Sequence, residues 1–245
     1  MATQLLIYER AVPVSSQRHS KWSVEVGANY GFSRSVNSVP LMAVEFPAAA
    51  PEYPIVFAGA GEGVMPAVIL GVRGQENLFL TRENTWQGKY IPAFVRRYPF
   101  VFSTSEDNKT FTLCIDEAFG GFNQDERGQR LFDDQAKPTE YVQNVLKFLQ
   151  EYQVQFHRTQ AFCRKLQELG LLDPMQAQVT LGADKRTSLS GFQTVSRERL
   201  KALAGDKLSE LAKTDELELV YLHLQSLRNF AGFGERLASH TPAAA

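Results

Sequence analysis

Residues 138–170 read PTEYVQNVLKFLQEYQVQFHRTQAFCRKLQELG, and this stretch decides the fold class. Its mostly apolar positions recur at intervals of three and four residues, at 142, 145, 149, 152, 156, 159, 163 and 166. That spacing predicts one face of a long helix. Thr139 can cap the start of the helix, Gly170 can end it, and Pro174 blocks its continuation.

The sequence on either side of this helix has a different pattern. Before it, short apolar and β-branched runs separated by turn residues predict strands at 4–8, 22–26, 39–46, 53–58, 67–72, 77–81, 100–103 and 110–115. A short helix is expected at 89–97, where it would end before Pro99. After the long helix, 176–181 and 188–194 predict a hairpin, and short helices follow, the last capped by Thr214 and running to about residue 231.

These elements predict an α+β fold. We expect an N-terminal antiparallel β-rich half, arranged as a meander or a partly open barrel, packed against C-terminal long helices and a β-hairpin. A single domain is expected over 1–245, with the β-rich half at about 1–117 and the helical half at 138–240. The polar residues 118–137 predict a loop between them, anchored at Leu131–Asp134 and either functional or mobile.

Composition excludes several classes of protein. Apolar residues make up 44% and charged residues 22%, which is typical of a globular protein with a real core. A net charge of −1 gives no basic field for nucleic acid. The longest apolar run, 64–72, is too short to span a membrane, and no export signal is visible. We therefore expect a soluble, cytoplasmic protein, with surface association by a nonclassical route as the alternative.

No cofactor or metal site is predicted. The four histidines are scattered, and neither Cys114 nor Cys163 belongs to a Cys-x-x-Cys pair, so both are expected to be reduced core thiols. His223 lies in an apolar helix and is expected to be a hydrogen-bonded core residue. The glycines of 59–63 lack the dinucleotide-binding spacing and predict a hairpin turn instead.

The segment Trp86–Phe100 is the strongest candidate for a binding site, because it combines five aromatic rings with two arginines and a lysine. In one interpretation the rings fasten a short helix to the sheet, and the arginines pair with Asp116 or Glu117. In the other, the segment lines a groove for a peptide or a carboxylate, which a planar guanidinium binds in a bidentate way. The predicted binding residues are Trp86, Tyr90, Arg96, Arg97, Tyr98 and Asp116.

The sequence names no reaction. Ser190 lacks the leading glycine of a nucleophile elbow. Asp116 and Glu117 are adjacent at the end of a predicted strand, so their side chains face opposite ways and do not form a ready acid–base pair. Catalysis therefore stays undecided, and an enzyme would require these carboxylates and an arginine to converge on one cleft.

Short motifs along nearly the whole chain carry a family resemblance. They are Tyr8–Pro13 with His19, Asn37–Leu41, Glu45–Pro47, Tyr53–Phe57, Glu76–Leu80, Trp86, Tyr90–Pro92, Arg96–Phe100, Cys114–Glu117, Leu131–Asp133 and Ser190–Phe192. In these motifs the chain resembles the bacterial SapC family, named for a surface-layer gene locus. A peptide-transport permease of similar name is excluded, because the sequence has no spanning segment.

The resemblance implies a link to surface-layer loci, and its members are also found beside genes for outer-membrane receptors and oxidative tailoring enzymes. It supplies no catalytic residues. We expect an accessory protein that binds a polypeptide or a small acidic ligand, with a protein or peptide partner. The alternatives are an enzyme or enzyme partner in oxidative tailoring of a peptide or small molecule, and a structural component of the surface layer.

Overall fold

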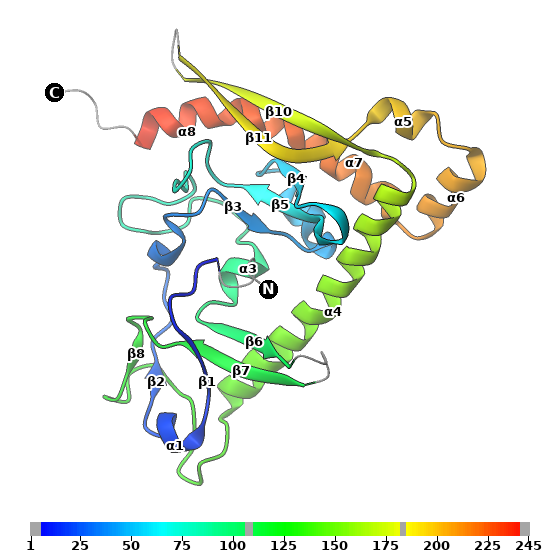
Figure 1. Ribbon diagram of the computed structural model, residues 1–245. Helices are drawn as coiled ribbons and strands as arrows, with labels where there is room; N and C mark the ends of the chain where they lie inside the picture. The colour runs from blue at the N-terminus through cyan, green and yellow to red at the C-terminus, as the bar shows by residue number, and fades with distance from the viewer. Residues whose placement is uncertain (1–5, 106–109, 182–184, 241–245) are drawn as a thin grey trace, which may run out of the picture. The chain divides into compact units, whose positions relative to one another are not determined.

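The computed structural model describes residues 6–105, 110–181 and 185–240 (Figure 1). The chain forms two compact units, each built from two separate segments. The first unit comprises Met1–Asn29 and Val95–Val154, and the second comprises Tyr30–Phe94 and Gln155–Ala245. These boundaries differ from those of the predicted halves, and the single domain expected from the sequence stays a prediction.

A three-stranded antiparallel sheet forms the centre of the first unit, in the order β1-β7-β6. Its strands are β1 (Ala11–Pro13), β6 (Phe100–Thr104) and β7 (Phe111–Asp116). The strands predicted at 100–103 and 110–115 are therefore confirmed, whereas the turn between them falls outside the described residues at 106–109. The strand predicted at 4–8 is wrong over its described residues 6–8, because the chain turns there and pairs only from Ala11 onward.

A second small sheet in the first unit corrects the expectation of a plain loop at 118–137. β2 (Ser23–Val24) pairs on one side with β8 (Phe122–Asn123) and on the other with β9 (Gln129–Arg130). β2 lies within the strand predicted at 22–26, whereas β8 and β9 are two residues long and carry too little alternation to be recognised in a sequence. The predicted anchor of this segment is confirmed at its first two residues, since the side chains after β9 at 131 and 132 are buried in the core of the unit.

The second unit contains a five-stranded sheet in the order β10-β11-β4-β5-β3. Its strands are β3 (Ser38–Pro40), β4 (Ile55–Ala58), β5 (Met65–Ile69), β10 (Leu172–Leu181) and β11 (Lys185–Val195). The glycine-rich segment 59–63 joins the antiparallel strands β4 and β5, which confirms the predicted hairpin. The strand predicted at 77–81 is wrong, because only an isolated bridge from Leu80 to Trp86 forms there.

Helices supply the rest of the architecture. The longest is α4 (Glu140–Glu168), which confirms the helix predicted from the apolar spacing (Figure 1). The others are α1 (Ser16–His19), α2 (Phe46–Ala49), α3 (Ala93–Arg96), α5 (Arg197–Lys201), α6 (Gly205–Lys213), α7 (Glu216–Ser226) and α8 (Phe233–His240), with short 3-10 helices at Gly31–Ser33, Ala43–Glu45, Gly61–Gly63 and Leu227–Gly232.

The last predicted helix differs from the structure at both ends. It is divided into α7 and α8 by the 3-10 helix, and α7 begins after Asp215, which has a left-handed backbone, rather than after Thr214. The Thr214 hydroxyl instead donates to the carbonyl of Glu210 at 3.1 Å, which closes α6. The fold is nevertheless α+β as predicted, and the strands of the described residues form no closed barrel.

Polar side chains of α7 fasten it to the central sheet of the second unit. His223 is fully buried, and its Nδ1 lies 2.8 Å from the carbonyl oxygen of Ile55. Its Nε2 accepts from the backbone N–H of Val195 at 3.0 Å, so the ring is neutral with its proton on Nδ1. Ser226 accepts from the N–H of Ile55 at 2.9 Å. The core role expected for His223 is confirmed.

None of the helices in the described part of the chain is both long enough and apolar enough to cross a bilayer.

Candidate functional site

The pairing of β1 with β7 brings two charged residues together at the end of the first sheet. Ala11 is the partner of Asp116 in the antiparallel register, so the preceding Arg10 lies opposite Glu117. The backbone N–H of Glu117 donates to the carbonyl of Arg10 at 3.1 Å. Opposite charges at facing positions of a strand pair are stabilising.

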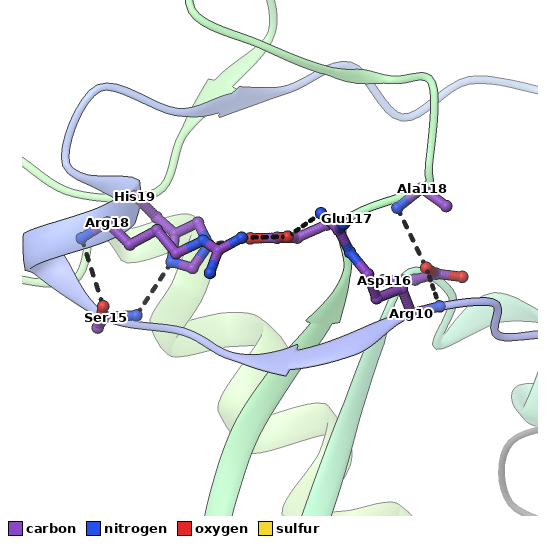
Figure 2. A network of polar contacts seen from close by, with 7 residues as sticks. All are labelled: Arg10, Ser15, Arg18, His19, Asp116, Glu117 and Ala118. Atoms are coloured by element: carbon purple, nitrogen blue, oxygen red, sulfur yellow. Dashed lines mark hydrogen bonds and ion pairs between the residues drawn. The ribbon is translucent and has the colours of Figure 1, made fainter.

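The carboxylate of Glu117 joins two arginines (Figure 2). Arg10 and Arg18 each direct Nη2 to the same Oε2 of Glu117; the Arg10 contact is very short and the Arg18 contact is 2.6 Å. The Glu117 side chain is only 1% exposed, whereas those of Arg10 and Arg18 are 65% and 57% exposed. A buried anion thus holds two guanidinium groups that face solvent.

His19 completes this cluster from α1. The backbone N–H of Ser15 donates to Nδ1 of His19 at 3.1 Å, so the ring proton lies on Nε2. Nε2 then donates to Oε1 of Glu117 at 3.0 Å. Both ring nitrogens are engaged and the side chain is fully buried, so the His19 ring orients the carboxylate. We call Arg10, Arg18, His19 and Glu117 the arginine cluster.

The electrostatics of the arginine cluster favour an ionised carboxylate. Burial would raise the pKa of Glu117, but hydrogen bonds from His19 and Arg10 and the charges of both arginines outweigh it, and the pKa lies below its ordinary value. One carboxylate and two guanidinium groups leave the cluster with an excess of one positive charge at neutral pH. Such a surface attracts anions.

Asp116 points away from Glu117 and has a different partner set (Figure 2). Its carboxylate is fully buried and accepts from the backbone N–H groups of Glu9, Arg10 and Ala118 at 2.8, 2.9 and 3.2 Å. The hydroxyl of Tyr98 donates to it at 3.2 Å. Asp116 therefore fixes the backbone before β1, which positions the arginine of that segment.

An aromatic hollow lies in the same unit. It has a volume of about 300 Å³ and is lined by Trp22, Phe122, Asn123 and Gln124. The rings of Trp22 and Phe122 are 5.5 Å apart between centroids. The His19 ring of the arginine cluster meets the Trp22 ring of the aromatic hollow edge-on at 4.9 Å, so the two sets of residues are in contact.

Four of the predicted binding residues, Arg96, Arg97, Tyr98 and Asp116, belong to the first unit. Arg97 is buried, with its guanidinium 5.0 Å from the ring centre of Tyr152 and 5.7 Å from that of Tyr8. Tyr98 packs against the same Tyr8 ring at 5.2 Å. Arg96 is exposed, and its guanidinium lies 5.4 Å from the ring centre of Phe148.

The other two predicted binding residues, Trp86 and Tyr90, belong to the second unit and are joined to each other by Tyr53. The indole N–H of Trp86 donates to the Tyr53 hydroxyl at 2.9 Å, and that hydroxyl makes a very short bond to the carbonyl of Tyr90. The hydroxyl of Tyr90 donates to the buried carboxylate of Glu45 at 2.7 Å. These contacts are those of a structural fastening, and a binding role for the six predicted residues stays a prediction.

Reasoning from patterns in the sequence missed the arginine cluster and the aromatic hollow. Arg18 and Glu117 are separated by 99 positions, so no local spacing connects them. Arg10 and His19 stood out only as parts of the motifs that carry the family resemblance. The strand register that unites them depends on pairing between β1 and β7, which periodicity does not reveal.

Nothing in the described part of the chain indicates a metal centre, since no three or more His, Cys, Asp or Glu side chains gather there as ligands. Cys114 and Cys163 are free and buried, as expected for core thiols. Burial raises the pKa of Cys163 to about 12, so this thiol stays protonated at neutral pH.

Comparison with known proteins identifies a family for the chain. The family model described as SapC matches residues 14–233, which includes most of both units. No curated protein and no solved structure matches the chain.

Proposed function

The chain belongs to the SapC family, and we propose that it is an accessory binding protein that captures an acidic segment of a polypeptide through Arg10 and Arg18. The observation that carries the proposal is the sharing of one buried carboxylate by two exposed guanidinium groups. Each arginine uses Nη2 on Glu117. Within the described ranges neither guanidinium has another hydrogen bond or ion pair, and both side chains are more than half exposed, so their remaining N–H groups are open to solvent.

Preorganisation makes the guanidinium groups of Arg10 and Arg18 suited to carboxylate ligands. An arginine loses side-chain entropy when it binds, and a guanidinium already held in place loses less. Charge-assisted bonds from guanidinium to carboxylate are about twice as strong as neutral hydrogen bonds. Two such groups side by side favour a ligand with more than one carboxylate, as in a run of Asp and Glu residues.

The partner set of Asp116 supports binding over catalysis. An enzyme built on Asp116, Glu117 and an arginine would need these groups to face one substrate. Asp116 instead accepts three backbone N–H groups, and Glu117 is used by the arginine cluster. We also propose an association with surface-layer or outer-membrane protein systems, which the family resemblance suggests, and a cytoplasmic location.

The proposal is tested by binding of a fluorescein-labelled peptide of Glu and Gly residues, followed by anisotropy at low salt. We expect Arg10→Gln/Arg18→Gln to weaken binding at least about tenfold, because both carboxylate contacts are lost. Arg127→Gln is the matched control, since Arg127 is 62% exposed but is paired with Glu25 and Asp125. This control should bind like the wild type.

Two results would overturn the proposal. If the wild-type protein does not bind the acidic peptide, the proposed function is wrong. A loss of binding in Arg96→Ala, with the Arg10→Gln/Arg18→Gln variant unchanged, would instead place the site on the segment predicted from the sequence. Circular dichroism of each variant separates weak binding from unfolding.

A further inference from the structure

We propose that the aromatic hollow is a second subsite, which takes an aromatic or large aliphatic side chain next to the acidic residues of the same polypeptide. This inference rests on the proposed function, because the arginine cluster supplies the acidic part of the recognition. It adds a sequence requirement to the ligand: a carboxylate residue followed closely by a bulky apolar one.

Proximity of the two sites is the first argument, because the buried His19 ring lies beneath both. His19 contacts Glu117 through Nε2 at 3.0 Å and meets the Trp22 ring at 4.9 Å. The second ring of the hollow, Phe122, is 5.5 Å from Trp22. A single extended peptide advances about 3.3 Å per residue, so neighbouring side chains of one ligand can reach both surfaces.

The chemistry of the lining is the second argument. The carboxamide of Asn123 donates to the carbonyl of Arg127 at 3.0 Å and accepts from the N–H groups of Asp125 and Arg127 at 3.1 Å each. The Asn123 carboxamide is therefore already satisfied, which leaves Gln124 as the other polar side chain of the lining. A sugar or a nucleobase would need several free donors and acceptors, whereas an aromatic side chain needs ring faces and edges, which Trp22 and Phe122 supply.

The size of the hollow and the charge of the neighbouring arginine cluster favour the same occupant, a bulky apolar side chain of an acidic polypeptide. A volume of about 300 Å³ is at the lower end for small-molecule sites, which suits one large side chain better than a cofactor. Tryptophan and arginine are the residues that most often dominate binding energy at protein interfaces. The positive arginine cluster next to the hollow selects an acidic partner by charge complementarity.

The test uses Trp22 as its own reporter. The protein has two tryptophans, so Trp86→Phe leaves Trp22 as the single tryptophan, which is excited selectively over the tyrosines. Three acetylated and amidated peptides, EEFEE, EEAEE and KKFKK, are titrated, and affinity is measured by calorimetry in parallel. We expect EEFEE to shift Trp22 emission and to bind at least tenfold more tightly than EEAEE, and KKFKK to bind at least tenfold more weakly than EEFEE.

The outcomes separate this inference from the proposed function. Equal affinity for EEFEE and EEAEE without a change in Trp22 emission would overturn the second subsite and leave the acidic site standing. Failure of both acidic peptides would overturn the proposed function. Equal affinity for KKFKK and EEFEE would show a purely apolar site and contradict the combined recognition.

Substitutions at the rim provide a second measurement. Phe122→Ala should weaken EEFEE more than EEAEE, but Phe122 also packs against Phe100 and Phe119, and the variant can lose its fold. Gln124→Glu avoids that problem, because Gln124 is exposed at the hollow. It should weaken EEFEE severalfold, whereas Gln129→Glu, another exposed glutamine of this unit, should not; equal effects would contradict the placement of the ligand.

Discussion

Nε2 of His19 donates to Oε1 of Glu117 at 3.0 Å, and this bond connects α1 to the end of β7 across 98 positions of the chain. The tautomer is fixed by Ser15, whose backbone N–H occupies the other ring nitrogen. The carboxylate is thus held by a neutral ring on one oxygen and by two guanidinium groups on the other. The geometry of the arginine cluster depends on this single acidic side chain.

Replacing that side chain should lower stability in a pH-dependent way. Glu117→Gln removes the charge that three donors share and is expected to cost about 2 kcal/mol of unfolding free energy at pH 7. The pKa of Glu117 lies below its ordinary value of 4.5 in the folded state, so its contribution is present above that pH and is lost as pH falls through the folded pKa. Urea titrations at pH 7, 5 and 3 measure the difference from wild type, which should shrink at pH 3. A constant difference would contradict this origin.

The buried histidine of α7 should weaken the fold in mild acid. Burial lowers the pKa of His223 to about 4, although its bond to the carbonyl of Ile55 acts in the opposite direction. Between pH 6.5 and pH 4 the unfolded chain binds a proton that the folded ring does not, so stability falls as pH falls, by up to about 3 kcal/mol. Urea titrations from pH 7 to 4 should show the loss, and His223→Gln should show less of it. An identical slope in that variant would assign the effect to other groups.

The fastening by Tyr90 predicts a stability effect without a binding effect. Tyr90→Phe removes the hydroxyl that donates to Glu45 and should cost about 1.5 kcal/mol, because the buried carboxylate loses a partner. Tyr221→Phe is the matched control, since Tyr221 is 47% exposed, and it should change stability by less than about 0.5 kcal/mol. Thermal or chemical unfolding measures both. A Tyr90→Phe variant of wild-type stability that no longer binds the acidic peptide would favour the groove predicted at Trp86–Phe100.

Two glycines of the turn between β4 and β5 should respond differently to the same substitution. Gly59 has a φ of +104°, and a Cβ there would lie 2.4 Å from the carbonyl oxygen of Gly63. Gly59→Ala should therefore cost at least about 2 kcal/mol. A Cβ at Gly63 meets nothing within 4 Å, so Gly63→Ala should be neutral or slightly stabilising. Unfolding midpoints of the two variants give the comparison, and equal midpoints would contradict it.

Periodic elements could be predicted from the sequence, and contacts between distant segments could not. The apolar spacing of 142–166 was sufficient to predict α4, because the buried residues of a helix recur every three or four positions in the sequence. The strand expected at 77–81 failed, since Asn77 uses its side chain to bond Ser33 and the N–H of Phe79 in place of a ladder.

The candidate site could not be predicted for the same reason, because its residues come from distant segments of the chain. The aromatic and arginine content of Trp86–Phe100 drew attention to that segment, but composition does not reveal whether a ring is used internally. Tyr90 and Arg97 both have buried partners that lie far from them in the sequence. Arg10 and Arg18 are unremarkable in sequence and gain their candidate role from one carboxylate about a hundred positions away.

The two segments of the first unit are synthesised at different times, and this order affects when the arginine cluster can form. Tyr30–Phe94 belongs to the second unit and emerges between the two segments of the first. β1 has no partner until β7 has been synthesised, and Arg10 and Arg18 stay without their shared carboxylate until residue 117 is translated. A nascent chain therefore carries Arg10 and Arg18 before their shared carboxylate exists, and the arginine cluster can form only after nearly half of the protein has been translated.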